Sequence, residues 1–187
     1  MDDLYLFVGK SASGKTTVAN FLEKKHGFKQ VNSYTTRPPR YDGEIGHVFV
    51  NDKQFDNLEE LVAYTEYNGF RYGTTAEQLD KCNIYVVDVP GVQTLLEKYK
   101  TNRKIVILYF NTNICSRINR MRKRGDSDTA IIERLLQDEK NDWRDQLNDL
   151  WPYEVYYNRT IYIYDMYADD DLATVVTRAE RYMGVGV

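Results

Sequence analysis

The sequence predicts an α/β protein of the three-layer sandwich type, with a mostly parallel central sheet between two layers of helices. The chain has 187 residues, which is the length of one domain. Short apolar runs of strand length alternate along it with amphipathic segments of helix length. Parallel strands separated by helices form a central sheet covered on both faces, so this alternation indicates the sandwich.

The first elements illustrate the pattern. Residues 4–8 are all apolar, as expected for a strand buried on both faces. Residues 15–25 have a helical pattern, and Gly27 is suited to the C-terminal cap. Residues 33–46 are polar and include two prolines, so we expect a loop there.

A small subdomain inserted into the sandwich is expected next. Short strand-like pieces occupy residues 47–50, 61–67 and 70–72. Asn68-Gly69 separates the last two and is a strong signal for a β-hairpin.

The alternation then resumes. The expected elements are a helix at 75–81, a strand at 84–88, helices at 91–99, 116–123 and 129–147, strands at 104–110 and 160–164, and a helix at 172–183. We expect Ile131, Ile132, Leu135 and Leu136 to form the apolar side of the long helix.

Composition excludes several classes of protein. Cys82 and Cys115 are far apart and form no metal-binding pattern, which favours a reduced, cytoplasmic protein over a disulfide scaffold. The net charge of −3 makes nucleic acid an unexpected partner. No apolar run approaches the ~20 residues of a membrane helix, and no targeting segment is expected. The 16 tyrosines, dense over residues 153–164, are expected to serve mainly packing.

Residues 9–16 (GKSASGKT) match the phosphate-binding loop pattern G-x-x-x-x-G-K-[ST] at every fixed position. An expected strand precedes the loop and an expected helix follows it. Backbone N–H groups of such a loop converge on phosphate, and its lysine reaches the β- and γ-phosphates. The residues expected to bind ATP are Gly9, Ser11, Ala12, Ser13, Gly14, Lys15, Thr16 and Thr17.

A magnesium site is expected beside this loop. The hydroxyl of Thr16 is one candidate ligand. Asp88 follows an apolar strand and is the candidate acid. Asp88 is also well placed to cap the next helix, and the two roles are compatible.

Arg37 and Arg40 lie three residues apart on a loop stiffened by Pro38 and Pro39. Guanidinium groups match phosphate oxygens in bidentate geometry, and proline lowers the entropy lost on fixing the loop. This segment is therefore a candidate clamp for an acceptor phosphate.

Several segments of the sequence resemble motifs of the guanylate kinases. Residues 33–40 (SYTTRPPR) resemble the acceptor-phosphate loop of that family, Ser-x-Thr-Thr-Arg-x-Pro-Arg. Residues 67–74 (YNGFRYGT) resemble its Phe-Gly-x-x-Tyr-Gly-[Ser/Thr] segment. Arg120 with Arg124-Gly125 resembles its lid, and Arg134 follows at the expected place. The matches run in family order over residues 4–165.

The resemblance implies a core of residues 1–32 and 75–187, a subdomain at 33–74 that binds a nucleoside monophosphate, and a lid at about 117–134. It implies that Ser33, Arg37, Arg40 and Tyr72 hold the acceptor phosphate. It places His47, Ala63, Thr74 and Asp88 around the acceptor. Lys15, Arg37, Arg120, Arg124 and Arg134 would carry catalysis, with ATP as donor and Mg²⁺ as cofactor.

The departures from the family concern the base. Where guanylate kinases present a glutamate to guanine, this chain has Ala63, and Pro90 stands where a second acid is expected. His47 replaces a tyrosine that binds the acceptor phosphate. Neither alanine nor proline has a side-chain acceptor for the guanine edge. Glu66, three residues beyond Ala63, would face the other side of the strand.

These observations predict an ATP-dependent kinase for nucleoside or deoxynucleoside monophosphates, with a base specificity altered from guanine. Two alternatives stay open. One is a kinase for a modified or non-nucleotide acceptor. The other is a non-catalytic module that binds phosphoproteins, although such a module has no need of Lys15. The oligomeric state, monomer or homodimer, is also open.

Overall fold

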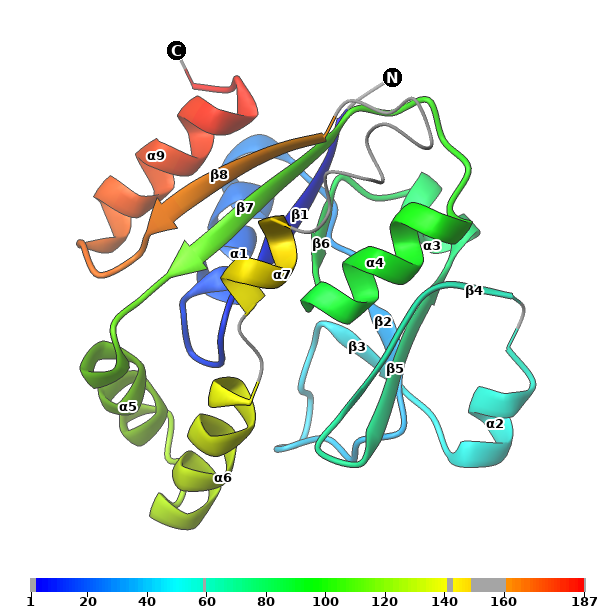
Figure 1. Cartoon of the computed structure of the whole chain (residues 1–187), viewed down its shortest axis with the longest axis horizontal. Helices are drawn as coiled ribbons and strands as arrows, with labels where there is room; N and C mark the ends of the chain where they lie inside the picture. The colour runs from blue at the N-terminus through cyan, green and yellow to red at the C-terminus, as the bar shows by residue number, and fades with distance from the viewer. Residues whose placement is uncertain (1–2, 59, 141–142, 149–160, 187) are drawn as a thin grey trace.

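The computed structural model describes residues 3–58, 60–140, 143–148 and 161–186. Its central sheet has four parallel strands in the order β6-β1-β7-β8 (Figure 1). These strands are β1 (Leu4–Val8), β6 (Ile84–Val86), β7 (Ile105–Asn111) and β8 (Ile161–Tyr167). The mostly parallel sheet that the sequence predicts is confirmed.

Side chains of β1 alternate between two hydrophobic clusters, one on each face of the sheet. Leu4 and Leu6 belong to one cluster, and Tyr5 and Phe7 belong to the other. The first cluster includes residues of α4 (Val89–Lys98) and α7 (Trp143–Asn148); the second includes residues of α1 (Lys15–His26) and α9 (Leu172–Met183). Helices therefore cover both faces, and the three-layer sandwich is confirmed (Figure 1).

A second four-stranded sheet has the order β3-β2-β5-β4. Its strands are β2 (Ser33–Thr35), β3 (His47–Phe49), β4 (Leu61–Tyr67) and β5 (Phe70–Thr75), with the short helix α2 (Asp52–Asp56) before β4 and α3 (Ala76–Asp80) after β5. Asn68 and Gly69 both have positive φ, at 51° and 74°, which is the type I′ geometry of a two-residue hairpin.

The prediction of a loop over residues 33–46 is wrong for its first residues, because Ser33–Thr35 form the strand β2. Tyr34 and Thr35 pair with Gly73 and Tyr72 of β5, nearly forty positions later. A strand of three residues has no readable alternation of its own, so only this remote pairing defines it.

The single helix expected at 129–147 is also wrong. The structure has α6 (Asp128–Glu139) and then the separate α7, and α6 lies beside α5 (Ile114–Lys123), away from the central sheet (Figure 1). Of the four residues expected on one apolar side, Ile131 is buried while Ile132 and Leu136 are exposed. Because the helix ends, Trp143 and Leu147 of α7 can pack in the hydrophobic core. Most of the stability of a helix comes from such tertiary packing, so two helices are favoured over one long helix.

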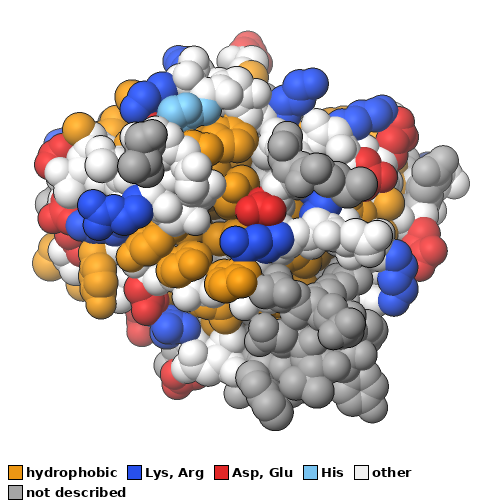
Figure 2. All heavy atoms as spheres, turned by 90° about the horizontal axis from the view of Figure 1, so that it is seen from above, with side chains coloured by type: hydrophobic (Ala, Val, Ile, Leu, Met, Phe, Trp, Pro, Cys, Tyr) orange, Lys and Arg blue, Asp and Glu red, His pale blue; other side chains and the backbone are white. Residues whose placement is uncertain are grey.

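Residues 153–160 of the tyrosine-rich segment lie outside the described residues. Tyr164 of β8 stacks on Tyr182 of α9, with ring centroids 4.5 Å apart, so this tyrosine serves packing. Within the described ranges, no helix has the length and apolar composition needed to cross a membrane. The end of the molecule that carries both termini shows lysine and arginine interspersed with aspartate and glutamate (Figure 2).

Candidate active site

The phosphate loop connects the carboxyl end of β1 to the first turn of α1. Gly9 has φ +146°, and a Cβ atom there would lie 2.6 Å from the carbonyl oxygen of Phe110 on β7. Gly14 has φ +101° and caps α1. Both positions require glycine, because the backbone is in the left-handed region and the loop passes directly against β7.

Lys15 points back into this loop. Its Nζ donates to the carbonyl oxygens of Gly9 (2.6 Å) and Lys10 (2.9 Å) and to Oγ of Ser13 (3.1 Å). Burial lowers the pKa of Lys15 to about 8, and the nearby carboxylate of Asp138 opposes this shift. The ammonium thus lies within the curve of the loop, bonded to the loop's own oxygen atoms.

A hollow of about 290 Å³ opens over the loop. It is lined by Ala12, Ser13, Gly14, Lys15, Thr16, Thr17, Arg120 and Arg124. Arg120 is fixed between the loop and the end of β8, since its guanidinium donates to the carbonyl oxygens of Ala12 (3.3 Å) and Ala168 (2.5 Å). A second hollow of about 220 Å³ adjoins it, with Val18, Leu172 and Val175 among its apolar lining. The structure therefore brings Arg120 and Arg124, two of the arginines expected in a lid, to the phosphate loop.

The two arginines of the acceptor loop share one carboxylate. Glu44 accepts from Nη2 of Arg37 at 2.8 Å, from Nη1 of Arg40 at 3.1 Å, and from the backbone N–H of Arg40 at 2.6 Å. Nε of Arg37 is buried and has no hydrogen-bond partner among the described residues. Glu44 thus holds the two arginines together as a pair.

Three other expected residues surround Arg37. Oγ of Ser33 and Nδ1 of His47 are 3.0 Å apart, and the ring of Tyr72 packs edge-on against that of His47. Tyr72 also interacts with Arg37. Burial, and then the charge of Arg37, lowers the pKa of His47 to about 4, so this histidine is neutral near pH 7.

Arg40 lies close enough to Arg124 and Arg134 for their charges to affect its pKa. Burial lowers the pKa of Arg40, and the charges of Arg37 and Arg134 add to this shift. Asp126 pairs with Arg124 and lies 3.7 Å from Nε of Arg134; Arg124 lowers the pKa of this carboxyl. Such a concentration of positive charge between the two segments is suited to binding phosphate groups.

The strand β4 presents Ala63, Thr65 and Tyr67 on one face. Ala63 is fully buried and lies opposite Thr74 of β5. Oγ1 of Thr65 donates to Asp88 at 2.8 Å. Glu66, on the other face, is exposed and accepts from the hydroxyl of Tyr64. The structure thus places no glutamate beside Ala63 on this face of β4.

Asp88 is the N-cap of α4, and its Oδ1 accepts from the N–H of Gly91 at 2.9 Å. Burial raises the pKa of this carboxyl. The capping role is confirmed. Asp88 also lies close enough to Lys15 to affect its pKa, so it adjoins the phosphate loop as well. Its role toward magnesium stays a prediction.

Four polar residues of this region escaped the sequence reasoning: Glu44, Thr65, Asp126 and Asp138. Glu44 and Asp126 lie close in sequence to the arginines that they pair with, so the local alternation of charge is a signal that could have found them. Thr65 and Asp138 are far in sequence from the residues that they contact, Asp88 and Ser11, so only the tertiary structure reveals them.

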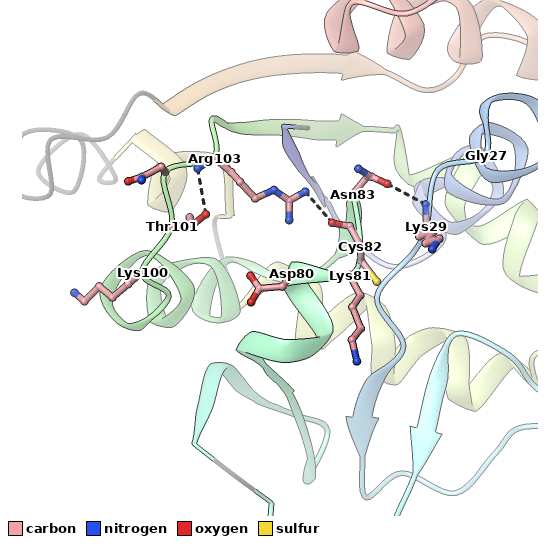
Figure 3. Close-up of a pocket in the computed structure, with 10 residues that line it drawn as sticks. Gly27, Lys29, Asp80, Lys81, Cys82, Asn83, Lys100, Thr101 and Arg103 are labelled. Atoms are coloured by element: carbon pink, nitrogen blue, oxygen red, sulfur yellow. Dashed lines mark hydrogen bonds between the residues drawn. The ribbon is translucent and has the colours of Figure 1, made fainter. Parts of the chain in front are cut away.

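A larger hollow, of about 960 Å³, lies at the opposite end of the central sheet (Figure 3). Arg103 is one of the residues that line it, and its guanidinium donates to the carbonyl oxygens of Leu79 (2.8 Å), Cys82 (2.8 Å) and Asp3 (3.0 Å). These bonds tie loops of the fold together. In α/β sheets ligands bind at the carboxyl ends of the strands, so we assign the active site to the phosphate-loop end.

Fold and site together define a P-loop kinase. No protein-family model matches the chain. Guanylate kinases of Nitrosomonas europaea and Clostridium tetani are 28% and 33% identical to it over 148 and 145 residues. These alignments cover 73% and 71% of this chain, and 73% and 68% of those proteins. The chain belongs to the guanylate kinase family.

Two solved structures share the fold. The guanylate kinase from Anaplasma phagocytophilum matches with a TM-score of 0.54 and 17% identity, over 98% of this chain and 85% of that one. An unliganded sugar kinase from Janibacter sp. HTCC2649 matches with a TM-score of 0.52 and 14% identity, over 100% of this chain and 96% of that one. At these identities the likeness concerns the fold alone.

Proposed function

We propose that this chain transfers the γ-phosphoryl group of ATP to the phosphate of a nucleoside or deoxynucleoside monophosphate, and that its acceptor is not restricted to guanine. The observations that support the reaction are the hollow over the phosphate loop, where Arg120 and Arg124 lie beside Lys15, and the pairing of Arg37 and Arg40 on Glu44. The acceptor phosphate is already an anionic nucleophile at neutral pH, so positioning and charge neutralisation are the main requirements.

Each part of the site has a role in this proposal. The loop residues 9–17 hold the triphosphate of ATP, and the apolar hollow beside Arg120 suits its base. The partly exposed guanidinium of Arg40 suits an oxygen of the acceptor phosphate. Arg120, Arg124 and Arg134 stabilise charge on the phosphoryl group as it transfers. We assign residues 33–74 to the acceptor subdomain and residues 117–134 to the lid.

The residues beside the loop fit Mg²⁺. The hydroxyl of Thr16 and the carboxylate of Asp88 are oxygen donors, which this ion prefers, and phosphate oxygens and water complete such sites. When bound, the ion neutralises charge on the β- and γ-phosphates.

The altered base specificity rests on the face of β4. Guanine carries donors on its pairing edge, and an unmatched buried donor costs about 1–3 kcal/mol. Ala63 supplies no acceptor, and Glu66 lies on the opposite face of the strand. Asp88 is the carboxylate bonded to this face, through Thr65, and we assign it to Mg²⁺ rather than to the base.

A coupled assay of ADP release with each ribo- and deoxynucleoside monophosphate tests the proposal, with Lys15→Ala as the blank. We expect turnover with at least one acceptor other than GMP and dGMP. Turnover with GMP and dGMP alone would refute the altered specificity but not the reaction. Turnover with none would refute the reaction.

A gain-of-function pair tests the role of position 63. Ala63→Glu is expected to raise kcat/KM for GMP about tenfold over Ala63→Gln, because the carboxylate matches both guanine donors whereas the amide of the near-isosteric control accepts with one atom only. Equal values in the two variants would contradict the assignment.

A further inference from the structure

A buried ion pair lies against the phosphate loop, and neither of its residues is among those expected to bind ATP or the acceptor. Arg117 of α5 pairs with Asp138 of α6, and their side chains are 2% and 0% exposed. Charges this deeply buried persist only where their hydrogen-bonding capacity is satisfied. The partners that satisfy this pair therefore show what it holds in place.

Most of those bonds go to Ser11 of the phosphate loop. Oδ2 of Asp138 accepts from the backbone N–H of Ser11 at 2.9 Å, and Nε of Arg117 donates to the carbonyl oxygen of Ser11 at 2.9 Å. Oγ of Ser11 lies 3.3 Å from Oδ1 of Asp138. Both backbone groups and the hydroxyl of this one loop residue are thus fixed by the ion pair.

The network also reaches the acceptor sheet. The hydroxyl of Tyr67, on the last residue of β4, donates to Oδ1 of Asp138 at 3.2 Å and lies 3.2 Å from Oγ of Ser11. A flanking ion pair joins Lys10 of the loop to Glu139 of α6 at 3.0 Å. Asp138 is therefore the point where the phosphate loop, the two helices of the lid region and the acceptor sheet meet.

We propose that Asp138 is a positioning residue for phosphoryl transfer, which locks these three parts of the molecule in one arrangement through Ser11 and Tyr67. The inference rests on the proposed kinase function, in which donor and acceptor phosphates must be aligned by separate segments of the chain. Small displacements of reacting groups cost large factors in rate, so a bond that joins those segments acts on kcat rather than on the affinity for ATP.

Tyr67→Phe is the sharpest test, because it removes the bridging hydroxyl and leaves the ring, the ion pair and the loop intact. We expect kcat to fall about tenfold, with the KM of ATP within about twofold of wild type. We also expect hydrolysis of ATP without acceptor to rise relative to transfer, since a less well-locked site admits water.

Tyr64→Phe is the matched control. It deletes a hydroxyl from the same strand, but that hydroxyl is bonded to Glu66 on the other face. We expect it to keep the wild-type kcat and ratio of hydrolysis to transfer. A Tyr67→Phe variant that is indistinguishable from Tyr64→Phe, or that changes only the melting temperature, would overturn the proposal.

Asp138→Asn adds a coupling measurement. It is expected to lower kcat by at least twentyfold, and adding Tyr67→Phe to it should then cost less than a further twofold, because both changes break one network. If Tyr67→Phe lowers kcat by the same factor in the Asp138→Asn variant as in the wild type, the two residues do not act through a shared network. If Asp138→Asn does not fold, Tyr67→Phe and its control decide the matter. An inactive wild-type chain would instead refute the proposed function itself, which is a separate result.

Discussion

Replacing Gly9 with alanine should damage both the fold and the nucleotide site. Gly9 has φ +146°, where a side chain costs about 1–3 kcal/mol. The new Cβ atom would lie 2.6 Å from the carbonyl oxygen of Phe110 and 3.1 Å from Oγ of Ser13. Phe110 belongs to the central strand β7, so its backbone cannot yield cheaply. We expect a total loss of about 3 kcal/mol, or roughly 6–12 °C in melting temperature.

Gly27→Ala is the control for backbone strain alone. Gly27 has φ +71°, and a Cβ atom there meets nothing within 4 Å, so a loss of about 1 kcal/mol is expected. Thermal denaturation and calorimetric titration with ADP would compare the two variants. We expect Gly9→Ala to melt lower and to bind ADP at least tenfold more weakly. Equal melting temperatures and equal ADP affinities would refute the close packing of the loop on β7.

Three further outcomes follow from the electrostatics of the site. Arg40→Ala should raise the KM of the acceptor about 30-fold, since a charge-assisted bond contributes about 2 kcal/mol, and should leave the KM of ATP unchanged. The control is Arg71→Ala, because Arg71 pairs with Asp52 and Asp56. Equal acceptor KM values in the two variants would contradict the phosphate clamp. The pKa of His47 is about 4 when folded against 6.5 ordinarily, so the neutral form contributes stability above pH 6.5 that is lost as the pH falls toward 4. Melting temperatures should therefore fall faster in wild type than in His47→Gln over this window, and parallel curves would count against a buried neutral ring. The pKa of Lys15 is about 8, so the lysine loses its charge as the pH rises from about 7 to about 9, and the affinity for ADP measured by calorimetry should weaken over this range. The affinity of the Lys15→Arg variant should not change with pH. A wild-type affinity that is independent of pH would disprove the pKa shift.

Much of the fold could be read from the chain because its signals are local. The strand at Leu4–Val8 and the helix at Leu172–Met183 were predicted at the bounds that the structure shows. The turn at Asn68-Gly69 was readable for the same reason, since positive φ at both positions suits these residue types. Where the reading failed, the deciding contacts were remote. The strand Ser33–Thr35 exists through pairing with β5, and the break after Glu139 exists because Trp143 packs under the sheet.

The candidate site divides in the same way. The phosphate loop, Arg37 and Arg40 were predictable because their function depends on backbone geometry and residue spacing within a few positions. The effect of the Arg134 charge on the pKa of Arg40 depends on the tertiary structure, since the two residues are far apart in sequence.

By itself, then, the sequence determined a parallel α/β sandwich and a phosphate loop, and it predicted an arginine pair for a second phosphate. Tertiary structure alone decided that Thr65 bonds Asp88 and that Asp138 joins Ser11 to Tyr67. The physical reason is distance along the chain. Glycine conformation and helix capping act between neighbours and leave a pattern, whereas a hydrogen bond such as that between Asp138 and Ser11, 127 residues apart, depends on how whole elements pack.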